Sequence, residues 1–128
     1  MKHILIVDDA ATVRMYHRAI LEGAGFAVNE AVNGVEALEK ALAAGAGGTP
    51  PFDLYVVDVN MPQMDGYSFL RALRGQDVNQ SPAVMVSTEA EDSDRRQAFE
   101  AGANLYIVKP TRSDVLLRYV KLLLGEAA

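Results

Sequence analysis

The sequence contains no cysteine, so neither disulfide bonds nor thiolate metal sites are available to it. It also lacks a long apolar run: no stretch approaches the ~20 apolar residues of a membrane-spanning helix, and two acids interrupt the N-terminal apolar segment too early for a signal peptide. Basic residues are in the minority, 12 against 17 acidic ones, so the net charge is −5. This balance argues against nonspecific binding to nucleic acid or to an anionic membrane. We therefore expect a cytoplasmic protein that binds neither.

Apolar residues make up half of the 128-residue chain, which is typical of one globular domain. Four short apolar runs are rich in β-branched residues and do not alternate with polar ones. Such runs indicate strands that are buried on both faces of a parallel sheet. They are Ile4–Val7, Leu54–Val57, Ala83–Val86 and Leu105–Val108. A fifth segment, Phe26–Ala31, is more polar and predicts an edge strand.

Helical spacing of apolar residues occurs between and after these runs. The predicted buried faces consist of Val13, Tyr16 and Ile20; Val35, Leu38 and Leu42; Phe69, Leu70 and Leu73; Ala98 and Ala101; and Val115, Leu116, Tyr119, Val120 and Leu123. We expect Asp92 or Ser93 to cap the fourth helix, and His17 to lie partly exposed in the first. Residues 43–51 are expected to form a flexible loop, too short for a linker.

Five strands that alternate with five helices predict an α/β fold with a doubly wound parallel sheet, and a single domain over residues 1–128. In such sheets, functional residues lie beyond the carboxyl ends of the strands. The polar residues that follow the predicted strands are Asp8, Asp9, Asp58, Ser87, Thr88 and Lys109. We therefore expect three carboxylates, two hydroxyl groups and one ammonium group to gather at one edge of the sheet.

Three carboxylates at one place repel one another, and a hard divalent cation such as Mg²⁺ would relieve that repulsion. Neither histidine follows a strand, so zinc is not expected. A carboxylate can also act as a nucleophile and form an aspartyl phosphate. Lys109 could neutralise the added charge, and a hydroxyl group could donate a hydrogen bond to a phosphoryl oxygen.

Taken together, these motifs resemble the receiver domains of bacterial response regulators, most nearly the stand-alone CheY-like proteins of chemotaxis. The resemblance covers the whole chain and rests on Asp8-Asp9, on residues 58–66 (DVNMPQMDG), on Ser87 and on Lys109-Pro110. It implies a flavodoxin-like (βα)5 sandwich with strand order 2-1-3-4-5. It also implies two-component signal transduction, in which a histidine kinase donates the phosphoryl group.

Site roles follow from the same resemblance. Asp58 is expected to be the phosphoacceptor, with Ser87 and Lys109 as the groups that bind the phosphoryl oxygens. The implied ligands of Mg²⁺, or of Mn²⁺, are Asp8, Asp9, Asp58 and the backbone carbonyl of Asn60. Tyr106 is expected to turn inward as Ser87 moves.

Further features of the chain bear on this expectation. Asn60 and Glu89 are expected to flank the water that hydrolyses the phosphoryl group. Thr88 replaces a usually smaller residue and is expected to narrow access to the site. A cis peptide bond before Pro110 and a turn at Gly66 are also implied.

The resemblance places target binding on the face of the fourth helix, fifth strand and fifth helix. That face carries Glu91, Asp92 and Thr111, where the chemotaxis archetype has basic residues and an aromatic one. The chain has no room for an output domain, so the expected output is a partner protein rather than an enzymatic activity.

Three functions remain open: a phosphorylation-controlled binding switch, a phosphorelay shuttle or phosphate sink, and a phosphatase of the haloacid-dehalogenase type. The last would generally need an aspartate two residues after Asp58, where this chain has Asn60.

Overall fold

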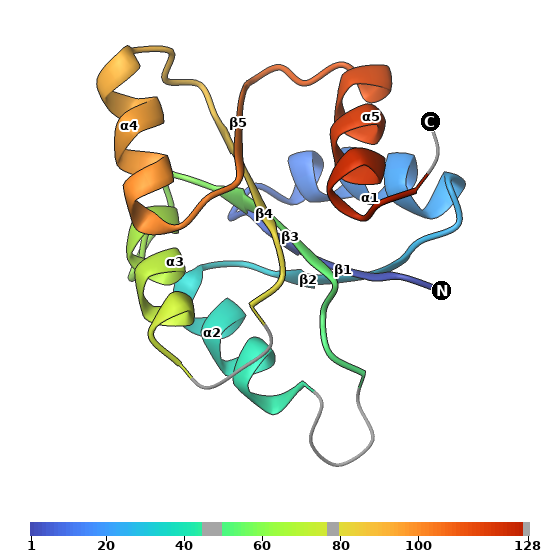
Figure 1. Cartoon of the computed structure of the whole chain (residues 1–128), viewed down its shortest axis with the longest axis horizontal. Helices are drawn as coiled ribbons and strands as arrows, with labels where there is room; N and C mark the ends of the chain where they lie inside the picture. Colours follow the sequence, from blue (N-terminus) through green and yellow to red (C-terminus); the bar gives the residue numbers. More distant parts are fainter. Residues whose placement is uncertain (45–49, 77–79, 127–128) are drawn as a thin grey trace.

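The computed structural model describes residues 1–44, 50–76 and 80–126. Its five strands form one parallel sheet in the order β2-β1-β3-β4-β5 (Figure 1), which confirms the predicted doubly wound fold. The strands are β1 His3–Val7, β2 Ala27–Ala31, β3 Leu54–Asp58, β4 Ala83–Ser87 and β5 Leu105–Val108. The four apolar runs therefore predicted their strands to within one residue at each end.

Burial differs between the central and the edge strands. Every residue of β1, β3 and β4 is buried, as the unbroken apolar runs predicted. β2 forms one edge and mixes buried with exposed residues, as expected. β5 forms the other edge, and only Ile107 in it is buried. The prediction that β5 is buried on both faces was therefore wrong, because an edge strand has a neighbour on one side only.

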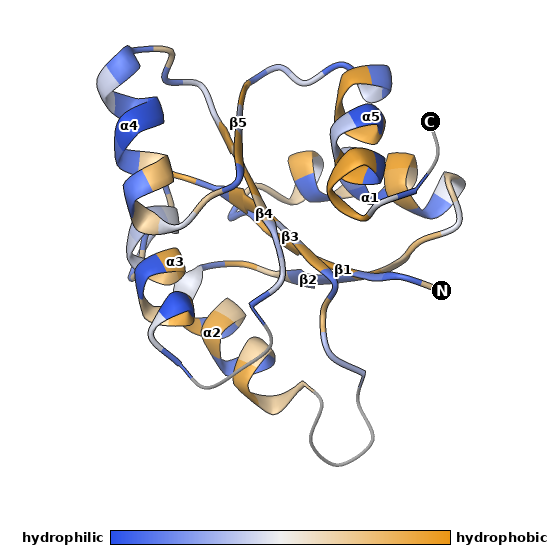
Figure 2. Cartoon of the chain, in the orientation of Figure 1, coloured by the Kyte–Doolittle hydropathy of each residue, from blue (hydrophilic) through white to orange (hydrophobic). Residues whose placement is uncertain are grey.

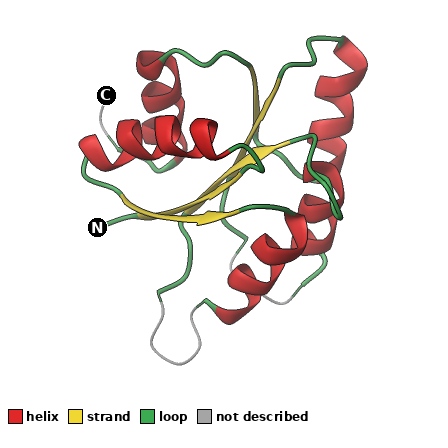
Figure 3. Cartoon of the chain, turned by 180° about the vertical axis from the view of Figure 1, so that it is seen from behind, coloured by secondary structure: helices red, strands yellow, loops and turns green. Residues whose placement is uncertain are grey.

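Helices cover both faces of the sheet. α1 (Ala11–Gly23) and α5 (Ser113–Leu123) lie on one face, and α2 (Gly34–Ala43), α3 (Gly66–Arg74) and α4 (Asp92–Ala101) lie on the other (Figures 1 and 3). In the parts of the chain that the structure describes, each of these helices is too short or too polar to span a bilayer.

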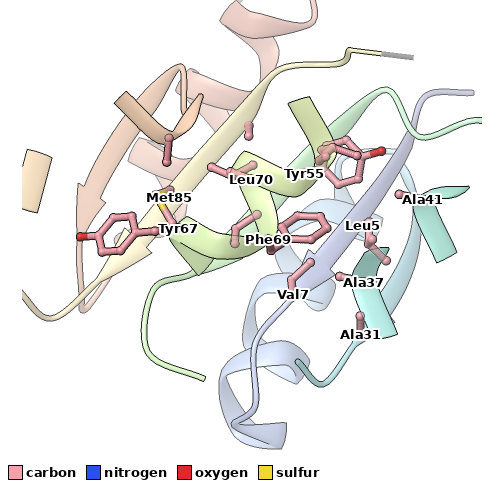
Figure 4. Close-up of a cluster of buried hydrophobic side chains, with 14 of the residues drawn as sticks. Leu5, Val7, Ala31, Ala37, Ala41, Tyr55, Tyr67, Phe69, Leu70 and Met85 are labelled. Atoms are coloured by element: carbon pink, nitrogen blue, oxygen red, sulfur yellow. The ribbon is translucent and has the colours of Figure 1, made fainter. Parts of the chain in front are cut away.

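The two layers enclose two apolar clusters, because alternate side chains of a strand point to opposite faces. Ile4 and Ile6 pack with Leu21 of α1 and Leu116 of α5. Leu5 and Val7 pack with Phe69 of α3 and the other members of the second cluster (Figure 4). Hydrophobic residues accordingly concentrate in the strands and on the inner sides of the helices (Figure 2).

The buried side of the first helix is displaced from the predicted one, although Ile20 of that prediction packs against the cluster of Leu21. Its buried residues are His17 and Leu21, whereas Tyr16 is 47% exposed. The prediction that His17 is partly exposed was therefore wrong: only 2% of this residue is accessible. His17 lies four residues after Val13 and four before Leu21, so these three residues share one side of α1.

The second helix shows a similar difference. Ala37 and Ala41 are buried, while Val35 is 36% and Leu42 is 44% exposed. The predicted residue Leu38 packs against the same apolar cluster as Ala37 and Ala41 from a partly buried position, so the prediction was wrong for Val35 and Leu42 only. By contrast, the predicted face of α3, formed by Phe69, Leu70 and Leu73, is fully buried.

The predicted N-cap of the fourth helix was also wrong. Its N-cap is Glu91, and not Asp92 or Ser93. The Glu91 side chain and that of Asp94 form a reciprocal capping box with each other's backbone N–H groups. Residues 45–49 of the loop that we expected to be flexible lie outside the described residues.

Candidate functional site

Three aspartates meet at the carboxyl ends of two neighbouring strands. Val7 pairs with Val57 in the register of β1 and β3, so Asp8 and Asp58 follow at the same level. Asp8, Asp9 and Asp58 each offer one carboxylate oxygen, and these oxygens lie within 4.8 Å of one another. Asp8 and Asp58 are buried, whereas Asp9 is exposed to solvent. The structure therefore brings the three predicted carboxylates together.

Lys109 reaches this cluster from the end of β5. Its Nζ donates hydrogen bonds to Asp8 Oδ2 at 2.9 Å and to Asp58 Oδ1 at 3.1 Å. The peptide bond between Lys109 and Pro110 is cis, as the resemblance implied. One ammonium group thus bridges two carboxylates that come from different strands.

Burial raises the pKa of Asp58 to about 6, and the neighbouring Asp8 carboxylate adds to this rise, while Lys109 opposes it. Burial acts to lower the pKa of Lys109, but its hydrogen bonds to Asp8 and Asp58 outweigh that effect and raise the pKa above the usual value. The ammonium group thus remains charged at neutral pH, yet it does not fully offset the negative charge around Asp58.

The donor set suits a hard divalent cation. All three groups are carboxylate oxygens, and the exposed Asp9 leaves the cluster open to solvent, as Mg²⁺ requires in order to keep part of its water shell. The backbone N–H of Ala10 donates to Asp8 Oδ1 at 2.9 Å, which orients this carboxylate. Asn60 lies two residues beyond Asp58 with an exposed side chain, and the role of its carbonyl as a ligand stays a prediction.

The predicted hydroxyl and switch residues are joined through the backbone of one residue, Glu89. Ser87 is fully buried at the end of β4, and its Oγ accepts a hydrogen bond from the backbone N–H of Glu89 at 3.1 Å. The hydroxyl group of Tyr106 donates to the backbone carbonyl of Glu89 at 2.8 Å. The side chain of Glu89 is itself exposed. Ser87 and Tyr106 are therefore connected through the backbone of Glu89, and their roles as switch residues stay a prediction.

A pocket of about 300 Å³ adjoins Lys109. Val13, Tyr16 and His17 line it from α1, and Thr88 lines it from the loop after β4. Burial lowers the pKa of His17, so this ring is neutral at neutral pH. The sequence analysis did not predict that residues of α1 line this pocket. The spacing of Val13, His17 and Leu21 at intervals of four could have indicated that His17 lies on the same side of α1 as Val13. Thr88 is exposed at the pocket, and its role in controlling access stays a prediction.

The loop after β3 brings Gly66 against the backbone of Asp58. The Gly66 N–H donates to the carbonyl of Val59 at 2.8 Å. Its φ angle is not in the positive region, so a left-handed backbone conformation is not what favours glycine here. Glycine is needed at this position because there is no space for a side chain: an added Cβ would lie 2.2 Å from the carbonyl oxygen of Asp58.

Replacing Gly66 by alanine is expected to lower the free energy of unfolding by at least about 2 kcal/mol, because two backbone segments must move apart. Urea denaturation monitored by circular dichroism measures this change. Gly23→Ala is the matched control: a Cβ there meets nothing within 4 Å, and alanine should stabilise α1 by about 0.5 kcal/mol. Equal stabilities of the two variants would contradict the close approach at Asp58.

Comparisons with known proteins agree on one family. A family model described as response regulator receiver domain matches residues 4–121. The chain is 40% identical over 126 residues to the transcriptional regulatory protein ResD of Bacillus subtilis (strain 168), covering 98% of this chain and 49% of that protein. It is 36% identical over 120 residues to the sensor protein EvgS of Escherichia coli (strain K12), covering 94% of this chain and 9% of EvgS. The chain thus spans about half the length of ResD and much less of EvgS.

Solved structures show the same similarity. The chemotaxis protein CheY4 of Vibrio cholerae superposes with a TM-score of 0.86 at 34% identity, covering 96% of this chain and 98% of that one. The receiver domain of the sensor histidine kinase PA1611 of Pseudomonas aeruginosa has a TM-score of 0.86 at 27% identity and covers 98% of both chains. That structure has a magnesium ion coordinated in its active site cleft.

Proposed function

Because the chain belongs to the response regulator receiver domain family, we propose that its Asp58 carboxylate accepts a phosphoryl group from a histidine kinase. The observation that carries this proposal is the Lys109 ammonium group, which bridges Asp58 and Asp8 beside the open carboxylate of Asp9. Two-component signalling of this kind is the function of the family, and the assignment to particular residues is our own.

Hydrogen bonding distinguishes Asp58 from Asp8 as the acceptor. Both oxygens of Asp8 are engaged, one by the backbone N–H of Ala10 and the other by Lys109. Asp58 uses only Oδ1, towards Lys109, and within the described residues its other oxygen has no hydrogen-bond partner. Asp58 is therefore the buried carboxylate with an oxygen left for attack on phosphorus.

In the proposed transfer, the free carboxylate oxygen of Asp58 attacks the phosphorus atom of a phosphohistidine. The P–O bond forms as the P–N bond breaks, and the electron pair of that bond stays on the leaving imidazole nitrogen. Lys109 is already in position to neutralise the phosphoryl charge, and the hydroxyl group of Ser87 can donate to a phosphoryl oxygen. Bound Mg²⁺, held by Asp8, Asp9, Asp58 and the carbonyl of Asn60, would supply further charge neutralisation.

The output that we propose is altered binding of a partner protein to the face formed by α4, β5 and α5. The support is the hydrogen-bonded connection from Ser87 through Glu89 to Tyr106, since Tyr106 belongs to β5 on that face. A phosphorelay shuttle or a phosphate sink would use the same chemistry at Asp58. In all three cases residues 1–128 act as one receiver domain, because every described strand belongs to a single sheet.

Direct phosphorylation tests the proposal. The protein is incubated with acetyl phosphate and Mg²⁺, and intact-mass spectrometry counts the phosphoryl groups. We expect one group per chain, its removal by hydroxylamine, and no labelling in the presence of EDTA. Failure to label with acetyl phosphate, with phosphoramidate and with every purified histidine kinase tried would refute the proposal.

Phosphotransfer from the labelled chain separates the three roles. Transfer onward to a histidine phosphotransfer protein and back again indicates a shuttle. A target captured only by the beryllofluoride-treated protein indicates a switch, and loss of the group to water without either indicates a sink.

Thr88→Ala is expected to speed both labelling by acetyl phosphate and the loss of the phosphoryl group about threefold, which corresponds to ~0.6 kcal/mol in each barrier. The reason is that Thr88 lines the pocket beside Lys109, so a smaller side chain gives the donor and the attacking water more room. Phosphoryl occupancy against time, from intact mass, measures both rates. Ser93→Ala, an exposed change on α4, is the control, and rates unchanged in both variants would mean that Thr88 does not restrict access.

A further inference from the structure

We propose that Arg95 is a positioning residue: by stacking on Tyr106 it holds the Ser87 hydroxyl group ready for the phosphoryl group and couples that group to α4. This inference rests on the proposed function, since it concerns how the phosphorylated site is stabilised and how its state reaches the surface.

The contact between Arg95 and Tyr106 is the first step. The guanidinium carbon of Arg95 lies 5.4 Å from the centroid of the Tyr106 ring, within the range of a cation–π interaction. Both residues are partly buried. Among the described residues Arg95 forms no ion pair, so the aromatic ring is the specific partner of its charged group. The position of Tyr106 therefore depends on α4, the helix that carries Arg95.

The second step leads from Tyr106 to Ser87. The Tyr106 hydroxyl group donates to the Glu89 carbonyl, and the Glu89 N–H donates to Ser87 Oγ. Because Ser87 Oγ accepts this bond, its own proton remains available for donation to a phosphoryl oxygen. Ser87 is fully buried, so this orientation is maintained by the protein rather than by solvent. Arg95, Tyr106 and the backbone of Glu89 thus hold the hydroxyl group as a ready donor.

The third step concerns α4 itself. Only Ala98 and Ala101 of this helix are buried, and its remaining surface is largely hydrophilic (Figure 2). Two small side chains anchor a helix weakly, so the contacts near its N-terminal end matter more for its position. Two such contacts are present. Arg95 lies over the Tyr106 ring, and the hydroxyl group of Tyr67 donates to the backbone carbonyl of Asp94 at 3.3 Å. In Figure 4 this hydroxyl group points away from the apolar cluster around Met85.

Coupling of this kind is reciprocal. If Arg95 stabilises the orientation of Ser87 that binds a phosphoryl group, then a phosphoryl group at Asp58 must stabilise the contact of α4 with Tyr106 by the same factor. Phosphorylation then tightens the first turn of α4, and loss of Arg95 weakens both effects together.

The test compares Arg95→Ala with Arg96→Ala, which removes the same charge from the adjacent, exposed position. We expect Arg95→Ala to lower the rate of labelling by acetyl phosphate and the affinity for beryllofluoride two- to fivefold, the range of one partly exposed cation–π contact. Arg96→Ala should match the unmodified protein. Hydrogen exchange gives a second readout: beryllofluoride should slow exchange in residues 92–96 of the unmodified protein, and less so in Arg95→Ala.

A second pair of variants checks the α4 contact without changing charge. Tyr67→Phe removes the hydroxyl group that reaches Asp94, and Tyr55→Phe is the control at a buried tyrosine of β3. Faster exchange in residues 92–96 of Tyr67→Phe alone supports the role of these contacts in placing α4.

The outcomes separate this inference from the proposed function. If the unmodified protein is never labelled, the proposed function fails. If it is labelled but Arg95→Ala and Arg96→Ala behave alike in rate, affinity and exchange, the positioning role of Arg95 is refuted while the function of Asp58 stands. A thermal transition for each variant, monitored by circular dichroism, shows that the compared proteins are folded.

Discussion

Asp58→Asn is expected to reduce phosphoryl labelling at least about a thousandfold, to the limit of detection. An amide oxygen is a poor nucleophile, and removing the nucleophile of a covalent mechanism costs most of its rate. The other two acids do not replace Asp58, because both oxygens of Asp8 are engaged and Asp9 is exposed, away from the buried contact with Lys109. Intact mass after incubation with acetyl phosphate and Mg²⁺ measures the loss.

The control for this experiment is Asp114→Asn, which removes an exposed acid whose ion pair, among the residues that the structure describes, is with Arg112. It should label like the unmodified protein. Peptide mapping locates any label that remains. Normal labelling of Asp58→Asn, or a label that maps to Asp8 in the unmodified protein, would refute the assignment of the acceptor.

The contribution of Asp58 to the stability of the metal-free protein is expected to fall as the pH rises from about 4 to above 6. The pKa of Asp58 is raised from 3.8 to about 6 in the folded protein, mainly by burial. Between these values the folded state binds more protons than the unfolded state, so each increase in pH favours unfolding. The shift of about two units corresponds to at most ~3 kcal/mol, fully lost once the pH exceeds the folded pKa.

Urea denaturation of the unmodified protein and of Asp58→Asn in EDTA, at pH 5 and at pH 8, separates this effect from that of His17, whose lowered pKa makes stability fall as the pH drops below its usual value. Glu30 affects stability in a lower pH range. Its hydrogen bond to Arg18 lowers the pKa of Glu30 in the folded protein, so the stability that Glu30 contributes is lost only as the pH falls below the usual pKa of a glutamate. Asp58→Asn should be more stable than the unmodified protein at pH 8 and should lose the difference at low pH. A stability difference between Asp58→Asn and the unmodified protein that is the same at both pH values would contradict the raised pKa of Asp58.

Mg²⁺ should counteract the same loss of stability. At a concentration one hundred times its dissociation constant, a ligand that binds only the folded state adds ~2.7 kcal/mol of stability. We expect the unmodified protein to gain most of this at pH 8, and Asp58→Asn to gain clearly less because one carboxylate ligand is missing. Equal gains would show that Asp58 does not contribute to the cation site.

Much of the fold could be predicted because central parallel strands leave a strong local pattern. The runs at residues 4–7, 54–57 and 83–86 are buried on both faces, so they contain little except apolar residues. Once these strands were located, the residues after them identified the edge at which Asp8, Asp58 and Lys109 meet. The order of the motifs along the chain then supplied the family.

The helix faces were harder to predict. Spacing alone favours the largest apolar residues as the buried ones, yet α2 buries Ala37 and Ala41 and leaves Leu42 outside. In α1 the buried position belongs to His17, whose polar ring gave no reason to expect it. The side of a helix that faces the sheet depends on how closely the helix can approach the sheet. This distance depends in turn on the neighbouring helices.

The sequence by itself determined where the strands lie, which acids and which lysine follow them, and the family to which the chain belongs, because each of these depends on residue types within a short segment. Only the tertiary structure decided that Lys109 bridges Asp8 and Asp58, that Arg95 stacks on Tyr106, and that His17 is buried beside the site. The physical reason is that these contacts join side chains from different strands and helices. Their distances depend on strand order, on helix packing and on backbone approach, none of which is recorded in any single segment of the chain.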